Sequence, residues 1–275
     1  MKRSKLRAAV YGAIIGDAMG VPYEFMDRGS FQCTGMTGYG THHQPAGTWS
    51  DDGSMLLATC RSLRDHGGKV DIESIFQNFK NWYEEGAFTQ YGDVFDIGIA
   101  TRRALQTGEG QCGERDNGNG SLMRILPLAF ADCSEEDVRA VSAITHGHWI
   151  STEACSIYVH IIRRCLQGEP MADVVHSLEL EAPFDRIAGI DGLPEEEIRS
   201  GGFVVSSLEA AVWCVLTTDS FRDCLLKAVN LGSDTDTTAC IAGGLAAACC
   251  YEFEDIPSEW VDAVPKKELI EECLF

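Results

Sequence analysis

Residues 234–248 read DTDTTACIAGGLAAA, in which two aspartates precede a run of small and apolar residues. From Thr237 to Ala248 the run is apolar or small on every face of a helix. Such a helix is normally buried in a protein core, and its small side chains let neighbouring backbones pack closely against it. The stretch therefore predicts a buried helix over residues 237–248, with two carboxylates where it begins.

Helical periodicity continues through the rest of the chain, whereas the alternation typical of strands is scarce. Gly-rich loops at residues 28–53, 107–121 and 183–202 separate the helical segments, and none has the character of a domain linker. We therefore predict an all-α fold, a compact orthogonal helical bundle formed by a single domain over residues 1–275. The other predicted helices cover the N-terminal stretch, the residues just after the turn at 51–54, and the segments from Ile72 to Phe79, Ser134 to Ile144, Thr152 to Gln167, Leu208 to Val215 and Phe221 to Val229.

The charge balance narrows the choice of partners. The chain of 275 residues has 22 Lys and Arg against 42 Asp and Glu, a formal net charge of −20. Nucleic-acid binders grip phosphates with clustered Lys and Arg, and an acidic surface is also repelled by anionic membranes. No stretch approaches the ~20 apolar residues of a membrane span. We therefore expect neither a nucleic acid nor a membrane as a partner.

Cysteine usage indicates a reducing compartment. The 12 cysteines form no Cys-x-x-Cys pair, and Cys60, Cys214 and Cys240 fall at apolar helix positions, where free cysteine acts as a small hydrophobe. The N-terminal charges and apolar run imitate a signal peptide, but the run is short and Asp17 follows it. We expect it to be the first helix of a cytoplasmic protein with reduced cysteines.

Two acidic clusters lie at predicted helix starts, and a separate glutamate closes the stretch from Gly16 to Phe25. An aspartate before a helix is most often an N-cap, but a cap needs one side chain, and each cluster offers two carboxylates and a hydroxyl. Surplus acid beside a buried helix is costly unless something neutralises it. Carboxylate and hydroxyl oxygens suit Mg²⁺, Ca²⁺ or Mn²⁺, so the two clusters together could hold two divalent ions. The residues are Ser50, Asp51 and Asp52, then Asp234, Asp236 and Thr237, and the separate Glu24.

A further candidate site is the Gly-rich turn at residues 116–121, which precedes an apolar segment predicted to be a helix. Free N–H groups at a helix start can bind a phosphate. Asn-Gly pairs, however, also form ordinary turns. His146 follows a predicted helix and is either a structural histidine or a ligand contact, and the residues alone leave both alternatives open.

Several short motifs, each at one place along the chain, together resemble those of one known family. They are GDAMG (16–20) with Glu24, PAGTWSDDGSM (45–55), FDIG (95–98), GNGSLMR (118–124), Thr145-His146, SGGFV (200–204) and LGSDTDTT (231–238). In this order they resemble the ADP-ribosylglycohydrolase family, which includes the dinitrogen-reductase-activating glycohydrolases. The resemblance spans roughly residues 6–262, and its paired acidic motifs are specific in combination.

The resemblance implies a compact all-α fold with a binuclear magnesium or manganese centre. The family cleaves the α-N- or O-glycosidic bond between ADP-ribose and a modified side chain, commonly arginine, so it implies an ADP-ribosylated protein as partner and ADP-ribose as product. Many members have Thr at the position of Ser50, and the serine retains the hydroxyl. Several members have Thr or Ala at the position of Gly53. By motif match the metal ligands are Ser50, Asp51, Asp52, Asp234, Asp236 and Thr237, with Glu24 bridging to the centre directly or through water.

The chemistry of these residues agrees with that reaction. A water beside the metal ions can attack ribose C1″, where oxocarbenium character builds as the leaving group departs. We expect Asp51 or Asp52 to serve as ligand and base, and Glu24 to gate the site or transfer a proton. The turn at 118–121 would take the pyrophosphate. The expected substrate-binding residues are Gly98, Gly118, Asn119, Gly120, Ser121, Met123, His146 and Phe203.

Two alternatives remain at this stage. One is a dimetal hydrolase of another ADP-ribose conjugate, such as O-acetyl-ADP-ribose or an ADP-ribosylated nucleic acid. The other is a non-catalytic binder or immunity protein that blocks an ADP-ribosylating toxin. The complete set of acids favours catalysis, because a degenerate relative would be expected to have lost some of them.

Overall fold

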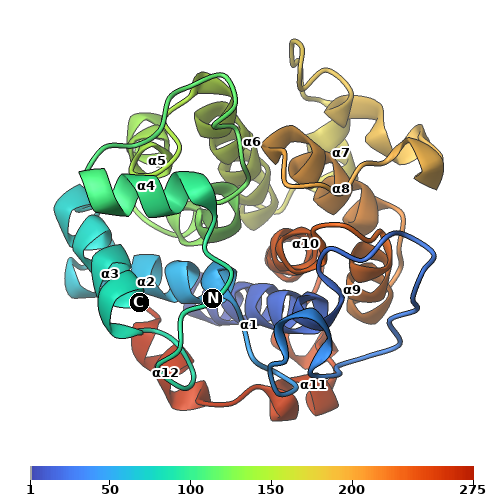
Figure 1. The fold of residues 1–275 in the computed structure, drawn as a ribbon. Helices are drawn as coiled ribbons and strands as arrows, with labels where there is room; N and C mark the ends of the chain where they lie inside the picture. Colours follow the sequence, from blue (N-terminus) through green and yellow to red (C-terminus); the bar gives the residue numbers. More distant parts are fainter. Residues whose placement is uncertain (1) are drawn as a thin grey trace.

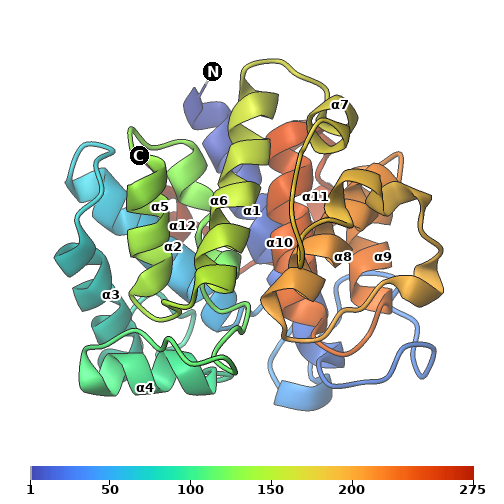
Figure 2. The ribbon, with the colours of Figure 1, turned by 90° about the horizontal axis from the view of Figure 1, so that it is seen from above.

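Helix α10 (Thr235–Cys249) runs through the centre of the molecule, as its composition predicts. The computed structural model describes residues 2–275, and in it every α10 residue from Thr235 to Ala248 is buried. Helices α1 (Lys2–Gly20), α6 (Trp149–Leu166), α8 (Val204–Leu216) and α9 (Phe221–Asn230) surround it (Figures 1 and 2). The central position of α10 places its N-terminal carboxylates deep in the structure.

The remaining helices pack on the two sides of this central group (Figure 2). Residues 2–275 form a single compact domain without a β-strand, and only isolated bridges occur. The all-α prediction is therefore confirmed. The further α-helices are α2 (Asp51–Asp65), α3 (Ile72–Glu85), α4 (Ile99–Thr107), α5 (Glu135–Ala143), α7 (Met171–His176), α11 (Ser258–Ala263) and α12 (Lys267–Cys273).

A face of three glycines on α1, spaced four residues apart, lets this helix touch the α10 backbone. A Cβ atom on Gly16 would lie 2.0 Å from the carbonyl oxygen of Ala239, and one on Gly20 would lie 2.3 Å from Cα of Asp236. Only glycine permits such an approach. The crossing brings Asp17 beside the start of α10. The three glycines are Gly12, Gly16 and Gly20.

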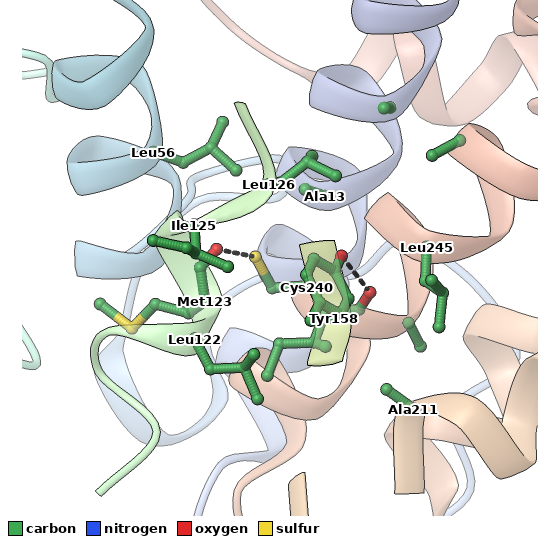
Figure 3. Packing of buried hydrophobic residues seen from close by; sticks show 14 of the residues in the cluster. Ala13, Leu56, Leu122, Met123, Ile125, Leu126, Tyr158, Ala211, Cys240 and Leu245 are labelled. Atoms are coloured by element: carbon green, nitrogen blue, oxygen red, sulfur yellow. Dashed lines mark hydrogen bonds between the residues drawn. The ribbon is translucent and has the colours of Figure 1, made fainter. Parts of the chain in front are cut away.

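Hydrogen bonds inside the core attach other elements to α10 (Figure 3). The Tyr158 hydroxyl of α6 donates to the carbonyl oxygen of Ile241 at 3.0 Å. The Cys240 thiol donates to the carbonyl oxygen of Met123 at 3.7 Å, which holds the segment after the Gly-rich turn against α10. Both groups would otherwise be polar atoms without partners in an apolar core.

Two predicted helix starts need correction. Helix α2 begins at Asp51 rather than after Ser54, because the Ser50 hydroxyl caps it by accepting from the Asp52 N–H at 3.2 Å. The segment after Ser121 is not an α-helix but two short 3₁₀ turns, Leu122–Arg124 and Leu126–Ala129. Pro127 has no N–H to donate, which interrupts a regular helix there. No long helix dipole therefore points at the Gly-rich turn.

The sequence reading missed α4, α7, α11 and α12, which are short or only weakly amphipathic. All 12 cysteines are free thiols, and Cys60, Cys214 and Cys240 are buried as predicted. Within residues 2–275 no helix combines the length and the apolar character needed to cross a bilayer.

Candidate active site

A cleft of about 580 Å³ opens where α10 begins. Residues from α2, α4, α10 and several loops line it, so most of the predicted site residues come together there. Those that line the cleft are Glu24, Asp51, Gly98, Gly118, Asn119, Gly120, Met123, His146, Asp234 and Thr237. Those that do not are Ser50, Asp52, Ser121, Phe203 and Asp236.

Three buried aspartates lie beneath one side of the cleft. Carboxylate oxygens of Asp17, Asp52 and Asp236 lie within 4.8 Å of one another, and all three side chains are 0% exposed. Asp236 also joins Glu24 and Asp234 in a second group of the same span. We call these five acids and Asp51, with the hydroxyls of Ser50 and Thr237, the acidic side of the cleft.

The N-cap alternative does not account for these acids. Ser50, not Asp51 or Asp52, caps α2, and Asp234 makes no side-chain capping bond at the start of α10. Instead, Asp52 Oδ2 accepts from the Ser50 and Thr237 hydroxyls, each at 3.2 Å. Asp52 Oδ1 and Asp236 Oδ2 have no hydrogen-bond partner although both are buried. Buried carboxylate oxygens without partners are costly, so this site calls for a cation.

Burial raises the pKa of these carboxyl groups. The pKa values of Asp51, Asp52 and Asp236 lie well above the ordinary range, first because of desolvation and then because other carboxylates are close. No Lys or Arg of residues 2–275 forms an ion pair with any of the three. The donor set is all oxygen, which fits a hard divalent ion.

Asp17 is a site residue that the sequence reading did not assign. Its carboxylate accepts from the backbone N–H groups of Ser50 at 3.0 Å and Gly53 at 2.8 Å, so it holds the first turn of α2. Burial raises its pKa to about 7. Gly53 is required by packing, because a Cβ there would lie 2.7 Å from the Trp49 ring. The sequence did offer a signal for a role of Asp17, because this aspartate lies in the GDAMG motif, between two of the glycines of the first helix.

Glu24 lies at the cleft edge with two partners that were also unassigned. Its carboxylate contacts the Nε2 atom of His42, and an oxygen of Asp96 lies in the same group. Burial raises the pKa of Glu24 to about 7, while the hydrogen bond from His42 acts in the opposite direction. That bond raises the pKa of His42. Asp96 lies in the FDIG motif, whereas nothing local marks His42.

The Gly-rich turn forms the opposite side of the cleft. The Asn119 N–H donates to the carbonyl oxygen of Gly202 at 3.1 Å, and its side-chain amide donates to Asp234 Oδ2 at 2.8 Å. The turn is thus anchored to both neighbouring loops. We call Gly118, Asn119, Gly120 and His146 the glycine-rich side of the cleft.

Two predicted substrate-binding residues lie apart from the cleft lining. Ser121 is buried, and its hydroxyl accepts from the Ser142 hydroxyl at 2.9 Å. Phe203 is 45% exposed and pairs through its backbone with Gly118, beside the cleft. The unpredicted helix α4 contributes Thr101 and Arg103 to the lining.

Comparison with known proteins identifies relatives along nearly the whole chain. A family model described as ADP-ribosylglycohydrolase matches residues 1–274. The chain is 33% identical to ADP-ribosylarginine hydrolase Tri1 of Pseudomonas putida (strain GB-1), over 94% of this chain and 74% of that protein. It is 31% identical to ADP-ribosyl-[dinitrogen reductase] glycohydrolase of Rhodospirillum rubrum, over 94% of this chain and 90% of that protein.

A solved structure has the same fold. It is an ADP-ribosylglycohydrolase-related protein complex, with a TM-score of 0.83 and 29% sequence identity, covering 99% of this chain and 96% of that chain. These matches confirm the resemblance seen in the motifs.

Proposed function

Because the chain belongs to the ADP-ribosylglycohydrolase family, and is thus a glycosidic hydrolase, we propose that it removes ADP-ribose from modified arginine side chains of proteins. The observation that carries this proposal is a cleft whose buried acidic side has no Lys or Arg of residues 2–275 paired with Asp51, Asp52 or Asp236 and faces a glycine-rich side. The named activity of the relative from Pseudomonas putida supports arginine as the modified residue.

The acidic side is suited to two divalent ions, Mg²⁺ or Mn²⁺. Ser50, Asp51, Asp52, Asp234, Asp236 and Thr237 would hold them, with Glu24 at the edge. The unpartnered oxygens of Asp52 and Asp236 support this assignment, because a metal ion would satisfy both. When bound, such ions supply Lewis-acid activation of a water and neutralise nearby negative charge.

The carboxyl groups of the chain itself provide the proton transfers. Hydrolysis at C1″ needs a base that takes a proton from water and an acid that protonates the departing guanidine. Asp51 lines the cleft and is proposed as the base. Glu24, with a pKa raised to about 7, can hold a proton near neutral pH and deliver it to the leaving group.

The glycine-rich side is proposed to bind the diphosphate of ADP-ribose. Gly118, Gly120 and His146 line the cleft together, and the absence of side chains on the two glycines lets the His146 ring pack against the turn. Arg103 and Arg115 also line the cleft and add positive charge. Gly98 and Met123 would contact the remaining parts of the ligand.

The test is release of ADP-ribose from defined conjugates. Purified protein is incubated with arginine-, serine- and DNA-linked ADP-ribose in Mg²⁺, Mn²⁺ or EDTA, and free ADP-ribose is quantified. We expect release from the arginine conjugate with either ion and none with EDTA. Release from the serine or DNA conjugate alone would favour another ADP-ribose conjugate as substrate. Binding of ADP-ribose without any release would favour a non-catalytic binder.

The partner, the product and the compartment are part of the same proposal. The substrate is an ADP-ribosylated protein and the product is ADP-ribose. The 12 free thiols support the cytoplasm as the compartment, because thiols stay reduced there.

A further inference from the structure

Arg124 is a buried cation that the proposed reaction does not use. Its side chain is 0% exposed, and it forms no ion pair with a carboxylate of residues 2–275. Nη1 donates to the carbonyl oxygen of Val141 at 3.2 Å, and the guanidinium lies 4.4 Å from the centre of the Phe79 ring. A buried charge without a counter-ion is expensive, so its remaining contacts indicate what it does.

One of those contacts leads to the cleft. Arg124 Nη2 donates to the Thr145 hydroxyl oxygen at 2.7 Å, and the same oxygen lies 2.9 Å from His146 Nδ1. A guanidinium has only donors, so the Thr145 oxygen must accept from it. The oxygen has a second lone pair, but within residues 2–275 the Thr145 hydroxyl has no hydrogen-bond partner other than Arg124 and His146 Nδ1. Its proton is therefore satisfied only when Nδ1 accepts it.

These two bonds favour one position for the proton of the imidazole. Because Nδ1 accepts, a neutral ring has its N–H at Nε2. A ring protonated on both nitrogens would bring a donor against the Thr145 hydroxyl proton. The arrangement therefore favours a neutral ring in one tautomer.

The Nε2 atom lies against the Gly-rich turn. A Cβ on Gly118 would be 3.3 Å from His146 Nε2, and a Cβ on Gly120 would be 2.9 Å from Cε1. His146 lines the cleft although it is only 3% exposed. The ring thus packs directly against the two glycines, and a side chain at either position would crowd it. The Nε2 edge lies next to the turn that borders the cleft.

We propose that Arg124 and Thr145 are positioning residues that hold His146 as a neutral imidazole, with its Nε2–H directed as a donor to the diphosphate of ADP-ribose. The proposal rests on the proposed function for the identity of the ligand. The hydrogen-bond relay itself is a property of the free protein.

The electrostatics support this geometry. Burial, and then the charge of Arg124, lower the pKa of His146 to about 3. The ring therefore stays uncharged across the range in which the protein would work. An uncharged ring in this tautomer still offers one hydrogen-bond donor, the Nε2–H.

The first experiment reads the tautomer of His146 by nitrogen NMR on protein labelled at histidine. In the wild type and in Thr145→Ser, Nδ1 should have the shift of an unprotonated nitrogen and Nε2 that of a protonated one. Thr145→Val removes the hydroxyl and should populate the other tautomer. The conservative serine variant keeps the test informative if the valine variant folds poorly.

The second experiment measures ADP-ribose affinity by calorimetry and separates KM from kcat. Thr145→Val should weaken binding and raise KM about 10-fold with little change in kcat, as expected for loss of one hydrogen bond to the ligand, and Thr145→Ser should stay within about twofold. Thr59→Val, which removes a buried hydroxyl bonded within α2, controls for a general packing effect and should leave affinity unchanged.

Neither NMR nor ADP-ribose binding requires hydrolysis, so their outcomes are separate from failure of the proposed activity. A wild-type His146 protonated at Nδ1, or an unchanged tautomer in Thr145→Val, would overturn the relay. A changed tautomer with unchanged ADP-ribose affinity would overturn the assigned role toward the diphosphate.

Discussion

The two sides of the cleft carry opposite buried charges, and neither is neutralised by protein. On the acidic side, Asp52 and Asp236 are fully buried without a cation. Behind the glycine-rich side, Arg124 is fully buried without a carboxylate. Burial without a counter-ion is costly in both places, but the two sides meet this cost differently. Arg124 does not line the cleft and is held by the neutral acceptors of Val141 and Thr145. The unpartnered oxygens of Asp52 and Asp236 have no such acceptor or donor, which is why metal ions are proposed there and not on the other side. The net charge of −20 does not reveal this difference.

The largest effect is expected when two carboxylates of the acidic side are removed. A double variant, Asp52→Asn with Asp236→Asn, should abolish ADP-ribose release. Mutation of residues that only contact metal ligands already lowers metal affinity or activity by about 10–100-fold, and loss of two proposed ligands should cost more. The assay is quantified release from ADP-ribosyl-arginine. The double variant Asp219→Asn with Asp262→Asn, at two exposed aspartates, is the charge-matched control and should keep full activity.

Stability measurements distinguish this loss from unfolding. Without metal, the asparagines remove repulsion among buried carboxylates, so the double variant should resist urea better than the wild type at pH 8. A less stable and inactive variant would leave the metal assignment without support.

The next effect concerns pH and the metal-free protein. The pKa of Asp17 is raised from 3.8 to about 7, so the folded state binds more protons than the unfolded chain between these values. Stability without metal should therefore fall as pH rises from about 4 to 7, by up to about 4 kcal/mol from this group alone. Urea unfolding in EDTA across this range measures it. Stability that rises with pH would show that the acids are not held as described.

Removal of the metal ions by a chelator should also weaken the binding of ADP-ribose. With the ions removed, the carboxylates repel the diphosphate, and ADP-ribose affinity should fall about 100-fold, or about 2.7 kcal/mol. Calorimetry with Mg²⁺ and with EDTA gives both constants. The double asparagine variant should no longer respond to EDTA, and equal affinity in the wild type under both conditions would contradict the proposed metal centre.

The smallest effect is expected from loss of the Asn119 side chain, which links the glycine-rich side to the acidic side. The Asn119 amide donates to Asp234 Oδ2 at 2.8 Å and to the Ser207 hydroxyl at 2.9 Å. Asn119→Ala should raise KM about 10-fold, as expected for one lost anchor of the turn. Steady-state kinetics test this, with Asn81→Ala on α3 as the control. Unchanged KM would mean that the turn holds its shape without the bridge.

Much of this site was predictable because its parts are short motifs. The acids at residues 51, 52, 234 and 236 each lie at a helix start, where a surplus carboxylate is visible without any structure. The Gly-rich turn was visible for the same reason. The 3₁₀ turns after it were also marked in the sequence, by Pro127, but the apolar character of the segment was interpreted as a regular helix. Asp17, His42 and Thr145 were missed as site residues, because their roles depend on partners elsewhere in the chain.

Local sequence alone dictated the all-α class and the buried helix α10, because periodicity and small side chains act between near neighbours. Tertiary structure decided which acids meet. Thr237 reaches Asp52 across 185 residues, and Asp17 reaches Ser50 across 33. The approach of α1 to α10 brings Asp17 into the same cluster as Asp52 and Asp236, and it requires the α1 glycines, where a single Cβ would collide with the opposite backbone. The hydrogen bond from Arg124 to Thr145 likewise exists only once the core has closed around it, because no local pattern assigns a buried cation its acceptor.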